Sequence, residues 1–446
     1  MAVSRRTAVI GGGMAGCAAA RELSRAGRDV VVLEAADGLG GRARSWHRPE
    51  LEPDVGVNLW FTNFYRVLFE RIREYGLESD LVEMSNNVII VHEGKPAEIT
   101  SDSMKTLFTY PHVSRLDRLR FLAVTLRETL RRRKLDMFEP ELLAAYDDGT
   151  TAAEWARRRI SPRGLDNLLR PEIESFWLWR CEEVSAAHIR ASQANIAGAR
   201  FYVFRQGMEV VAERMAAAAE VRLGCEVTDL AVANGGVRVT WRPADGDSTT
   251  EQFADAVVAT TAPVTAKLTA ALPDDVLAPA TRRFVETQRY EPALSVSYLV
   301  ERSSLPSEAH IVSTGDREHA VRTIITFPRR LVRDGQRRDM HLAFVYPGRR
   351  ETAELLNAPD DRVFERISEI APSLWPDFPR DAEPFLIARR PHAMPWPEPG
   401  RFRRSAQVAR SQRGPVTLAG DYFCSPTAEA AMRSGIRAAN ALLKTP

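Results

Sequence analysis

Short apolar runs alternate with stretches of helical periodicity along the chain, and this pattern indicates a mixed α/β protein. Residues 6–10 and 29–34 are runs of β-branched and other apolar residues, which is typical of buried parallel strands. Residues 17–26 favour a helix between them, and Gly27 is suited to cap its C-terminus. The first part of the chain therefore predicts a strand, a helix and a second strand in succession.

The segment that follows is mostly helical in pattern. Residues 62–76 have an amphipathic helical period, and residues 86–99 favour two strands joined at Glu93-Gly94. Helical patterns then continue through residues 103–197. Breaks in them are expected at the prolines, namely Pro111, Pro140, Pro162 and Pro171.

The second half of the chain returns to mixed character. Residues 206–219 favour a helix, and residues 221–241 favour a hairpin that turns at Asn234-Gly235-Gly236. Residues 255–260 predict another buried strand, and residues 414–443 predict a strand, a loop and a final helix.

Composition narrows the class of protein. The chain has 446 residues, of which 44% are hydrophobic and 27% charged, the balance of a globular protein with two or three domains. The formal net charge is only +2, so no nucleic-acid partner is expected. The basic run at residues 131–134 fits the solvated end of a helix, and we rank contact with anionic lipid or an acidic partner below that interpretation.

Cysteine usage and the absence of targeting patterns favour a reduced, cytoplasmic protein. Cys17, Cys181, Cys225 and Cys424 lie far apart and form no C-x-x-C pair, so neither a zinc site nor a disulfide framework is expected. The eight histidines show no metal-binding spacing, so no metal is predicted. No signal-peptide core or membrane-spanning stretch is recognised, and contact with a membrane surface is possible but not favoured.

A glycine-rich loop joins the first strand to the first helix. Gly11, Gly13 and Gly16 give the spacing G-x-G-x-x-G. Gly11 permits a tight turn, Gly13 lets the backbone approach a pyrophosphate, and Gly16 lets helix and strand pack closely. Met14 and Ala15 would then present the helix N-terminus to the negative phosphates.

An acidic residue ends the second strand. Glu34 lies 18 residues beyond Gly16, and its carboxylate can accept hydrogen bonds from ribose hydroxyls; Ala35 follows at the same edge. Strand, glycine loop, helix, second strand and terminal acid together predict a dinucleotide-binding site.

The residues after Glu34 carry a resemblance to a known family. Gly40-Gly41-Arg42 follows the ribose-binding acid, and here the sequence resembles the flavin-containing amine oxidase superfamily, which includes amine oxidases, protoporphyrinogen oxidases and carotenoid desaturases. In that superfamily a G-G-R segment lines FAD near its pyrophosphate and flavin. The resemblance therefore implies FAD as the cofactor, with Arg42 supplying charge-assisted hydrogen bonds.

The resemblance continues through the middle of the chain. Asp54-x-Gly56 with Trp60 is similar to the family's D-x-G segment, and Gly207-Met208 is similar to its G-G-M stretch. Val227 matches the strand whose backbone meets the adenine.

The closing segment, LAGDYFCSPTAEAAMRSG, resembles the last flavin motif of the family. The resemblance implies that Gly420 and Asp421 meet the ribityl or phosphate part of FAD, and that Ala431 and Met432 lie under the flavin. Ala430 stands where glycine is usual, which is a modest departure.

These segments together imply the fold class. We expect an α/β protein with a Rossmann-like FAD-binding domain (GR2-type) and an inserted α+β substrate domain, both discontinuous. The FAD-binding domain is predicted to comprise residues 1–90, 200–264 and 391–446, and the substrate-binding domain residues 91–199 and 265–390.

The expected reaction is transfer of a hydride from a substrate C–H bond to flavin N5, after which oxygen or a quinone accepts the electrons. Amine oxidases of the superfamily often place a lysine near flavin N5. The comparable strand here, residues 291–300, contains no lysine, and Lys267 lies in a helix-like segment. Classical amine oxidation is therefore disfavoured, and no catalytic acid or base is assigned.

Large aromatic residues suggest that the small-molecule substrate is apolar or aromatic. Core packing explains such residues equally well. The candidates for the pocket wall are Trp60, Trp177, Tyr202, Trp396 and Tyr422.

Several functions stay open at this point. The first is an FAD-dependent dehydrogenase, desaturase or oxidase acting on a lipophilic or aromatic small molecule, in specialised metabolism. The alternatives are a redox-neutral FAD-dependent isomerase, an amine oxidase, and a non-catalytic binding protein like the GDP-dissociation inhibitors. The intact glycines, Glu34 and Asp421 argue against the last.

Overall fold

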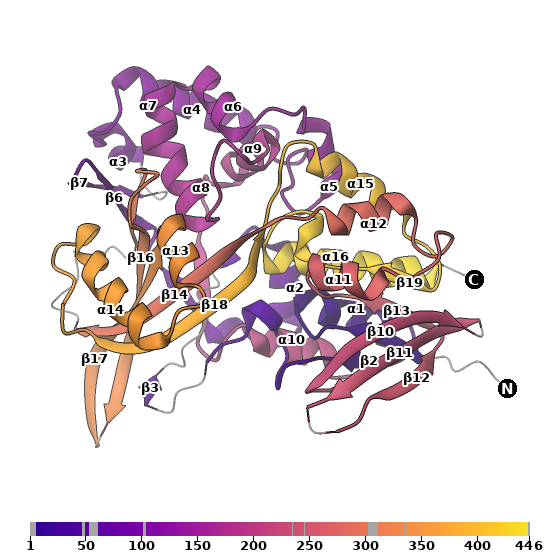
Figure 1. Ribbon diagram of the computed structural model, residues 1–446. Helices are drawn as coiled ribbons and strands as arrows, with labels where there is room; N and C mark the ends of the chain where they lie inside the picture. The colour runs from indigo at the N-terminus through magenta and orange to yellow at the C-terminus, as the bar shows by residue number, and fades with distance from the viewer. Residues whose placement is uncertain are drawn as a thin grey trace.

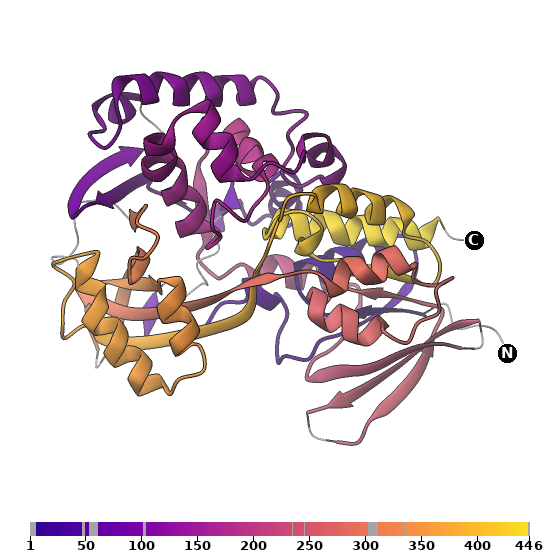
Figure 2. The same cartoon turned by 45° about the horizontal axis from the view of Figure 1, so that its top comes forward.

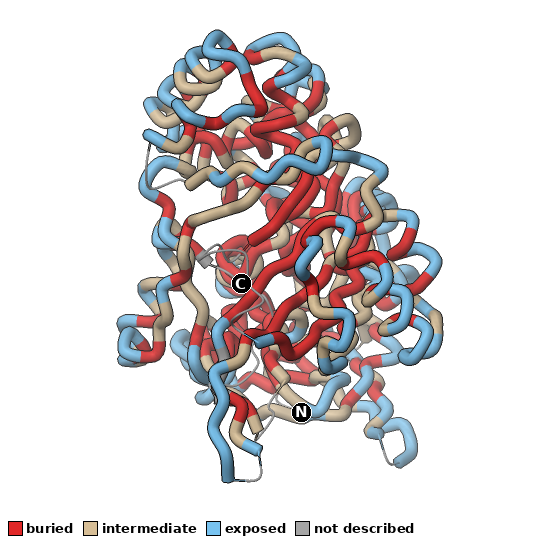
Figure 3. Tube along the Cα trace, turned by 90° about the vertical axis from the view of Figure 1, so that its left-hand side faces the viewer, coloured by how far each residue is buried: buried red, intermediate tan, exposed pale blue. Residues whose placement is uncertain are grey.

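The computed structural model describes residues 6–46, 50–52, 61–100, 104–233, 235–244, 246–301, 311–333 and 335–444. Four sheets are present in these ranges, and helices flank them (Figure 1). The N- and C-terminal ends lie on the same side of the molecule (Figure 1). Figure 3 shows buried stretches through the middle and exposed residues at the upper and lower ends.

A parallel sheet of five strands carries the N-terminal unit. β1 (Arg6–Ile10) lies at its centre, between β2 (Asp29–Leu33) and β13 (Asp255–Val258). β9 (Glu220–Arg222) and β19 (Val416–Leu418) form its edges. The predicted strands from the start, middle and end of the chain therefore lie side by side, as a Rossmann-like fold requires.

Two helices pack closely over this sheet. α1 (Met14–Arg25) follows β1, and α16 (Ala428–Leu443) lies against α1. A Cβ added to Gly435 would lie 2.0 Å from the carbonyl oxygen of Ala15, so the helix backbones approach where only glycine fits. This contact brings the last helix of the chain onto the first.

An antiparallel sheet of three strands stands beside the parallel sheet. It consists of β10 (Cys225–Ala233), β11 (Gly236–Pro243) and β12 (Thr249–Phe253). β10 and β11 pair as the predicted hairpin, with Ala233 opposite Gly236; Asn234 of the predicted turn lies outside the described residues.

A mixed eight-stranded sheet forms the other half of the molecule. Its order is β18-β14-β17-β16-β15-β6-β7, and β3 pairs with β16. The long strands β14 and β18 pair along their length and extend toward the first half (Figure 1). The strand bounds are β3 (Leu51–Glu52), β6 (Asn87–His92), β7 (Lys95–Thr100), β14 (Tyr290–Glu301), β15 (Ile311–Thr314), β16 (Val321–Arg333), β17 (Gln336–Pro347) and β18 (Glu383–Pro395).

A group of helices covers the upper left of the molecule (Figure 1). These are α3 (Met104–Thr109), α4 (Arg115–Thr129), α6 (Ala152–Arg159), α7 (Pro162–Gly164), α8 (Arg170–Phe176) and α9 (Ala186–Asn195). The remaining elements are α2 (Arg66–Glu74), α5 (Pro140–Leu143), α10 (Glu209–Ala216), α11 (Ala262–Thr269), α12 (Pro279–Glu286), α13 (Arg349–Leu355), α14 (Asp360–Ile370), α15 (Arg401–Ser411), β4 (Phe61–Thr62), β5 (Leu81–Met84) and β8 (Phe201–Phe204).

The expected helix break at Pro171 is wrong. Pro140 and Pro162 begin helices, but Pro171 lies inside a run that continues from α7 through a π-helical turn at Leu165–Leu169 into α8. Proline has no N–H to donate to the carbonyl four residues earlier, which belongs to Asn167. The Tyr110 hydroxyl donates to that carbonyl at 3.1 Å, so the carbonyl is satisfied although the intrahelical hydrogen bond is absent.

The expected domain limits cross elements of the structure. The limit at 90/91 falls inside β6, and the limit at 390/391 falls inside β18. The limit at 264/265 falls inside α11, and Phe284 of α12 packs in the same core as Val258 of the parallel sheet. We propose that residues 262–289 belong with the parallel sheet and that the other two limits lie at strand ends.

Candidate active site

The glycine loop between β1 and α1 leaves open space at the N-terminus of the helix. A Cβ at Gly16 would lie 1.9 Å from the carbonyl oxygen of Gly11, so helix and loop touch at this position. A Cβ at Gly13 would meet no atom within 4 Å. Gly13 is also the N-cap of α1, where no side chain makes a capping hydrogen bond. Space and backbone donors therefore coincide at the helix N-terminus, as an anionic phosphate requires.

Glu34 lies at the adjoining strand end. Its Oε2 accepts a hydrogen bond from the Gly12 N–H at 2.5 Å, and its Oε1 accepts one from Ala36 at 2.8 Å. The Cys225 N–H donates to the Glu34 carbonyl oxygen at 2.8 Å, and so ties the start of β10 to this edge. Val227, two residues further along β10, is buried nearby in the core beneath β2.

Two motifs from opposite ends of the chain meet through an ion pair. One guanidinium nitrogen of Arg42 donates to Asp421 Oδ1 at 2.7 Å, and another donates to the Ala393 carbonyl oxygen at 2.6 Å. Arg42 and Asp421 are 379 residues apart in sequence. The segment before Arg42 is tied to the glycine loop, because the Gly40 N–H donates to the Gly12 carbonyl oxygen at 2.9 Å.

The ion pair of Arg42 with Asp421 is partly buried. Burial lowers the pKa of Arg42, but the charge and the hydrogen bond of the Asp421 carboxylate raise it, and the net pKa lies above the ordinary value. Burial, followed by Asp421, raises the pKa of Tyr290, so its hydroxyl stays protonated and accepts from the Ala262 N–H at 3.1 Å. Arg42 is therefore a fixed cation beside the loop.

The closing helix positions Asp421. The Gly420 N–H donates to Ser434 Oγ of α16 at 3.0 Å. Of the two residues expected under a flavin, Ala431 is partly exposed and Met432 is fully buried in the core against α1. Ala430 fits in place of the family's glycine, and its N–H is capped by Thr427 Oγ1 at 3.1 Å.

Glu429 joins α16 to α2. Its carboxylate accepts from the Leu68 N–H at 2.9 Å and from Arg433 Nε at 2.7 Å, although burial raises its pKa. The carboxylate therefore caps the first turn of α2, where free N–H groups favour a negative charge.

The expected aromatic residues fall in different places. Trp177 and Trp396 share one core cluster; Trp177 stacks on Trp179 at 5.5 Å, and Trp396 lies 4.0 Å beneath the guanidinium of Arg289. Tyr202 instead packs edge-on against Phe69 at 5.6 Å, and Tyr422 packs against Phe284 and Phe423. Trp60, Asp54 and Gly56 lie outside the described residues.

Several residues of the region were missed in the sequence. The guanidinium of Arg390 lies 5.3 Å over the ring of Trp46, and burial followed by the nearby Arg42 lowers its pKa. No motif or spacing in the sequence singles out Arg390, and only its place two residues before His392 points to this segment. A second arginine therefore lies close to the ion pair of Arg42 with Asp421.

Leu178 has a strained backbone conformation and packs near Ala393, whose carbonyl oxygen accepts from Arg42. It is a non-glycine residue with φ of 61°, and its carbonyl oxygen accepts from Arg322 at 2.6 Å. Its side chain packs with Ala293 and Ala393, and Tyr346 and Met394 lie against them. Left-handed backbone at such a residue is costly and is concentrated at functional sites.

His188 is a buried imidazole between two tryptophan rings. Its ring lies edge-on to Trp177 at 5.0 Å and to Trp179 at 4.9 Å. Burial lowers its pKa to about 3, so the ring is neutral at physiological pH. The aromatic cluster around Trp177 is therefore uncharged at its centre.

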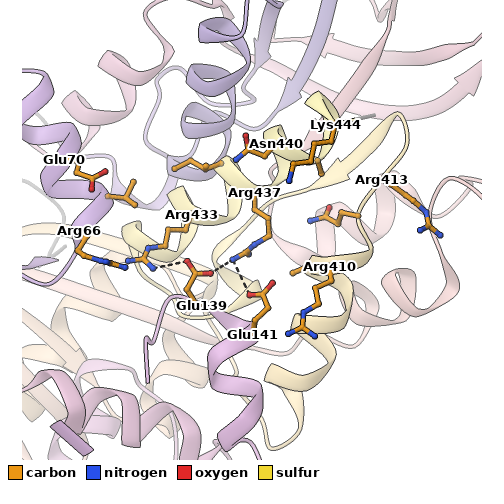
Figure 4. A pocket seen from close by; sticks show the side chains of 15 residues that line it. Arg66, Glu70, Glu139, Glu141, Arg410, Arg413, Arg433, Arg437, Asn440 and Lys444 are labelled. Atoms are coloured by element: carbon orange, nitrogen blue, oxygen red, sulfur yellow. Dashed lines mark hydrogen bonds and ion pairs between the residues drawn. The ribbon is translucent and has the colours of Figure 1, made fainter. Parts of the chain in front are cut away.

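A separate groove of about 790 Å³ lies along the outer face of α16 (Figure 4). Arg433 and Arg437 point toward Glu139 there, with N···O distances of 3.0 and 2.7 Å. The lining is dominated by charged side chains that pair with one another, so this groove lacks the apolar walls typical of a small-molecule redox site.

The metal and cysteine expectations can be compared with the described residues. No group of metal-ligating side chains is found there. All four cysteines are buried and unbonded to one another, and Cys424 Sγ lies 3.2 Å from the Met137 carbonyl oxygen. No helix among these residues is both long and apolar enough to cross a membrane.

Comparison with known proteins places the chain among flavoenzymes. A family model described as flavin containing amine oxidoreductase matches residues 14–443. An L-amino-acid oxidase of Sistrurus catenatus edwardsii is 36% identical over 74 residues, which is 17% of this chain and 14% of that protein. A probable zeta-carotene desaturase of Synechococcus elongatus is 25% identical over 192 residues, 41% of this chain and 40% of the relative.

The fold itself matches along the full length. A solved structure of a putrescine oxidase double mutant superposes with a TM-score of 0.73 at 17% identity and covers 98% of both chains. The sequence matches, by contrast, span less than half the length of the curated relatives.

Proposed function

Since the chain belongs to the family of flavin-containing amine oxidoreductases, we propose that it is an FAD-dependent oxidoreductase that oxidises a C–H bond of a lipophilic or aromatic small molecule. The observation that carries the cofactor assignment is the ion pair of Arg42 with Asp421. It joins the G-G-R segment to the closing motif directly beside the glycine loop, so three separate motifs surround one site.

Each part of the site has a role toward FAD in this proposal. The backbone of the glycine loop and the N-terminus of α1 would hold the pyrophosphate, and Glu34 with Ala35 would hold the adenosine ribose. Val227 would lie along the adenine, and Ala431 and Met432 would lie beneath the flavin, with Met432 contacting it through its backbone because its side chain is buried. The complete set is Gly11, Gly13, Met14, Ala15, Gly16, Glu34, Ala35, Gly40, Gly41, Arg42, Val227, Gly420, Asp421, Ala431 and Met432.

When bound, FAD would supply the hydride acceptor, with oxygen or a quinone as the final electron acceptor. The protein's part is to exclude water and orient the substrate. The cluster of Trp177 and Trp396 would supply an apolar wall, and the buried His188 beside Trp177 is neutral.

The positions of the lysines favour oxidation of an apolar C–H bond over classical amine oxidation. The chain has five, and every one of them is exposed: Lys95, Lys105, Lys134, Lys267 and Lys444. Lys267 lies on the outer side of α11, so no lysine is enclosed beside the Arg42 region. An apolar substrate that is oxidised to a C=C bond needs no such group.

Replacing Glu34 by alanine is expected to lower the affinity for FAD about tenfold or more, because the ribose loses a charged acceptor. Flavin released from equal amounts of purified wild type and variant measures the occupancy. Glu34→Gln keeps an acceptor oxygen and should lie between the two. Full flavin content in Glu34→Ala would show that the ribose is held elsewhere.

Anaerobic mixing with a panel of compounds tests the substrate class. Apolar polyenes and aromatic compounds are expected to bleach the flavin absorbance faster than primary amines do, by about tenfold or more. Faster bleaching by amines would contradict the proposal and make the protein an amine oxidase. Isomerised product with no acceptor consumed would replace oxidation by a redox-neutral reaction.

A further inference from the structure

The outer face of α4 is unusually apolar. Nine large apolar side chains are exposed in the described residues, and five of these belong to the segment from 108 to 130. Single exposed leucines are common, but a continuous row of them marks an interaction surface. The five are Phe108 (51% exposed), Leu116 (54%), Leu119 (59%), Leu126 (62%) and Leu130 (80%).

The four leucines form a stripe along one side of the helix. Each residue turns an α-helix by about 100°, so positions 116, 119, 126 and 130 fall within an arc of about 80°. Ala123, also exposed, falls within the same arc. The helix lies along the upper edge of the molecule, so this leucine stripe can meet a flat partner (Figure 2).

The acidic residues of α4 lie on its buried face, and several of its basic residues lie on its exposed side. The acidic residues Asp117 and Glu128 are on the buried face, where Asp117 caps the helix and Glu128 lies 3.3 Å from Arg190. The exposed cations surround the leucine stripe. They are Arg115, Arg120, Arg127, Arg132, Arg133 and Lys134.

Several cations lie close together near the C-terminal end of α4. Partial burial lowers the pKa of Arg127, and the nearby Arg131 and Arg159 lower it further. A second copy of the protein placed on this face would oppose cations to cations. An apolar stripe edged by cations instead complements a surface with an apolar interior and negative headgroups.

We propose that the leucine stripe of α4 and its flanking cations dock the protein on an anionic lipid surface. The leucines enter the level of the acyl chains, and the arginines and Lys134 meet the headgroups. This proposal does not depend on the proposed reaction. It places a lipid surface next to the aromatic cluster, because Val124 on the inner face of α4 packs in the same core as Trp179 and Trp396.

Co-sedimentation of the purified flavin-loaded protein with lipid vesicles tests the proposal. The protein is expected to bind vesicles of phosphatidylglycerol and phosphatidylcholine in about equal parts, and to bind phosphatidylcholine alone at least about tenfold more weakly. Raising the salt concentration is expected to weaken binding to the anionic vesicles.

Substitutions distinguish the contribution of the leucines to vesicle binding from that of charge attraction. Leu119→Ser with Leu126→Ser is expected to lower the vesicle partition coefficient about tenfold or more, and so is the second pair, Leu116→Ser with Leu130→Ser. The matched control is Val264→Ser, which changes an exposed apolar residue of α11 (40% exposed) and should leave binding within about twofold of wild type. Melting temperature and flavin absorbance check that every variant is folded.

Three results would overturn the proposal. One is the absence of binding to anionic vesicles at low salt. Another is equal binding by both serine pairs and wild type, which would mean adsorption by charge alone. The last is absence of vesicle binding together with a dimer that the serine pairs dissociate, which would make the face a contact between copies of the chain.

Discussion

Replacing Asp421 by alanine is expected to yield a protein that folds but retains little flavin, with an affinity for FAD lowered about a hundredfold. The substitution removes the acceptor that holds Arg42 at 2.7 Å and leaves a guanidinium beside Tyr290 and Arg390 without its carboxylate. Breaking a partly buried ion pair from one side should also cost about 2 kcal/mol of unfolding free energy. Flavin content and urea unfolding of the flavin-free protein measure the two effects.

A double variant distinguishes flavin binding from simple stability. Arg42→Met combined with Asp421→Leu leaves neither charge unpaired, so its unfolding free energy should return to within about 1 kcal/mol of wild type. Its flavin content should stay as low as that of Asp421→Ala. If either variant retained FAD with wild-type affinity, the ion pair would be a structural contact outside the cofactor site.

Gly16→Ala is expected to have the second large effect, a loss of about 3 kcal/mol or more of stability together with loss of flavin. The added methyl group would lie 1.9 Å from the Gly11 carbonyl oxygen, which is backbone and cannot rotate away. Helix α1 would have to move off the loop. Thermal unfolding of the purified variant measures the change.

Gly13→Ala is the matched control at the same loop. A methyl group there meets no protein atom within 4 Å, and φ of −74° suits alanine, so the stability should change by less than about 1 kcal/mol. Flavin affinity should nevertheless fall about tenfold or more, because the methyl group occupies the space where a pyrophosphate approaches. Wild-type flavin affinity in Gly13→Ala would contradict this placement of the phosphates.

The sequence predicted the parts of the fold that local patterns determine. The apolar runs of β1, β2, β13 and β19 are short and β-branched, and the spacing of Gly11 to Gly16 has few uses other than a strand-to-helix turn. The convergence of Arg42 with Asp421 followed from the family resemblance, because no local pattern links residues 379 positions apart.

Long-range pairing could not be predicted in the same way. The neighbours of β6 are β7, which follows in sequence, and β15, which comes some two hundred positions later, and nothing in either strand specifies that partner. The helix break expected at Pro171 failed because Tyr110, distant in sequence, satisfies the freed carbonyl of Asn167. Tertiary contacts override local propensity at both places.

The candidate site divides in the same way into residues that belong to local motifs and residues that only tertiary contacts bring to it. Glu34 and Asp421 are predicted because they end recognisable motifs, whereas Arg390 is not predicted because an arginine in a strand has no distinctive spacing. The leucine stripe of α4 was also hidden, since apolar residues occupy both faces of the helix and only the packing reveals which face is outside.

The absorption spectrum of the purified protein, with identification of the flavin that it releases on denaturation, tests the central claim most directly. A flavin spectrum with about one FAD per chain, bleached anaerobically by an oxidisable substrate, is the predicted result. A colourless protein that takes up no added FAD, although it is folded, would contradict the account and make the chain a binding protein without redox chemistry.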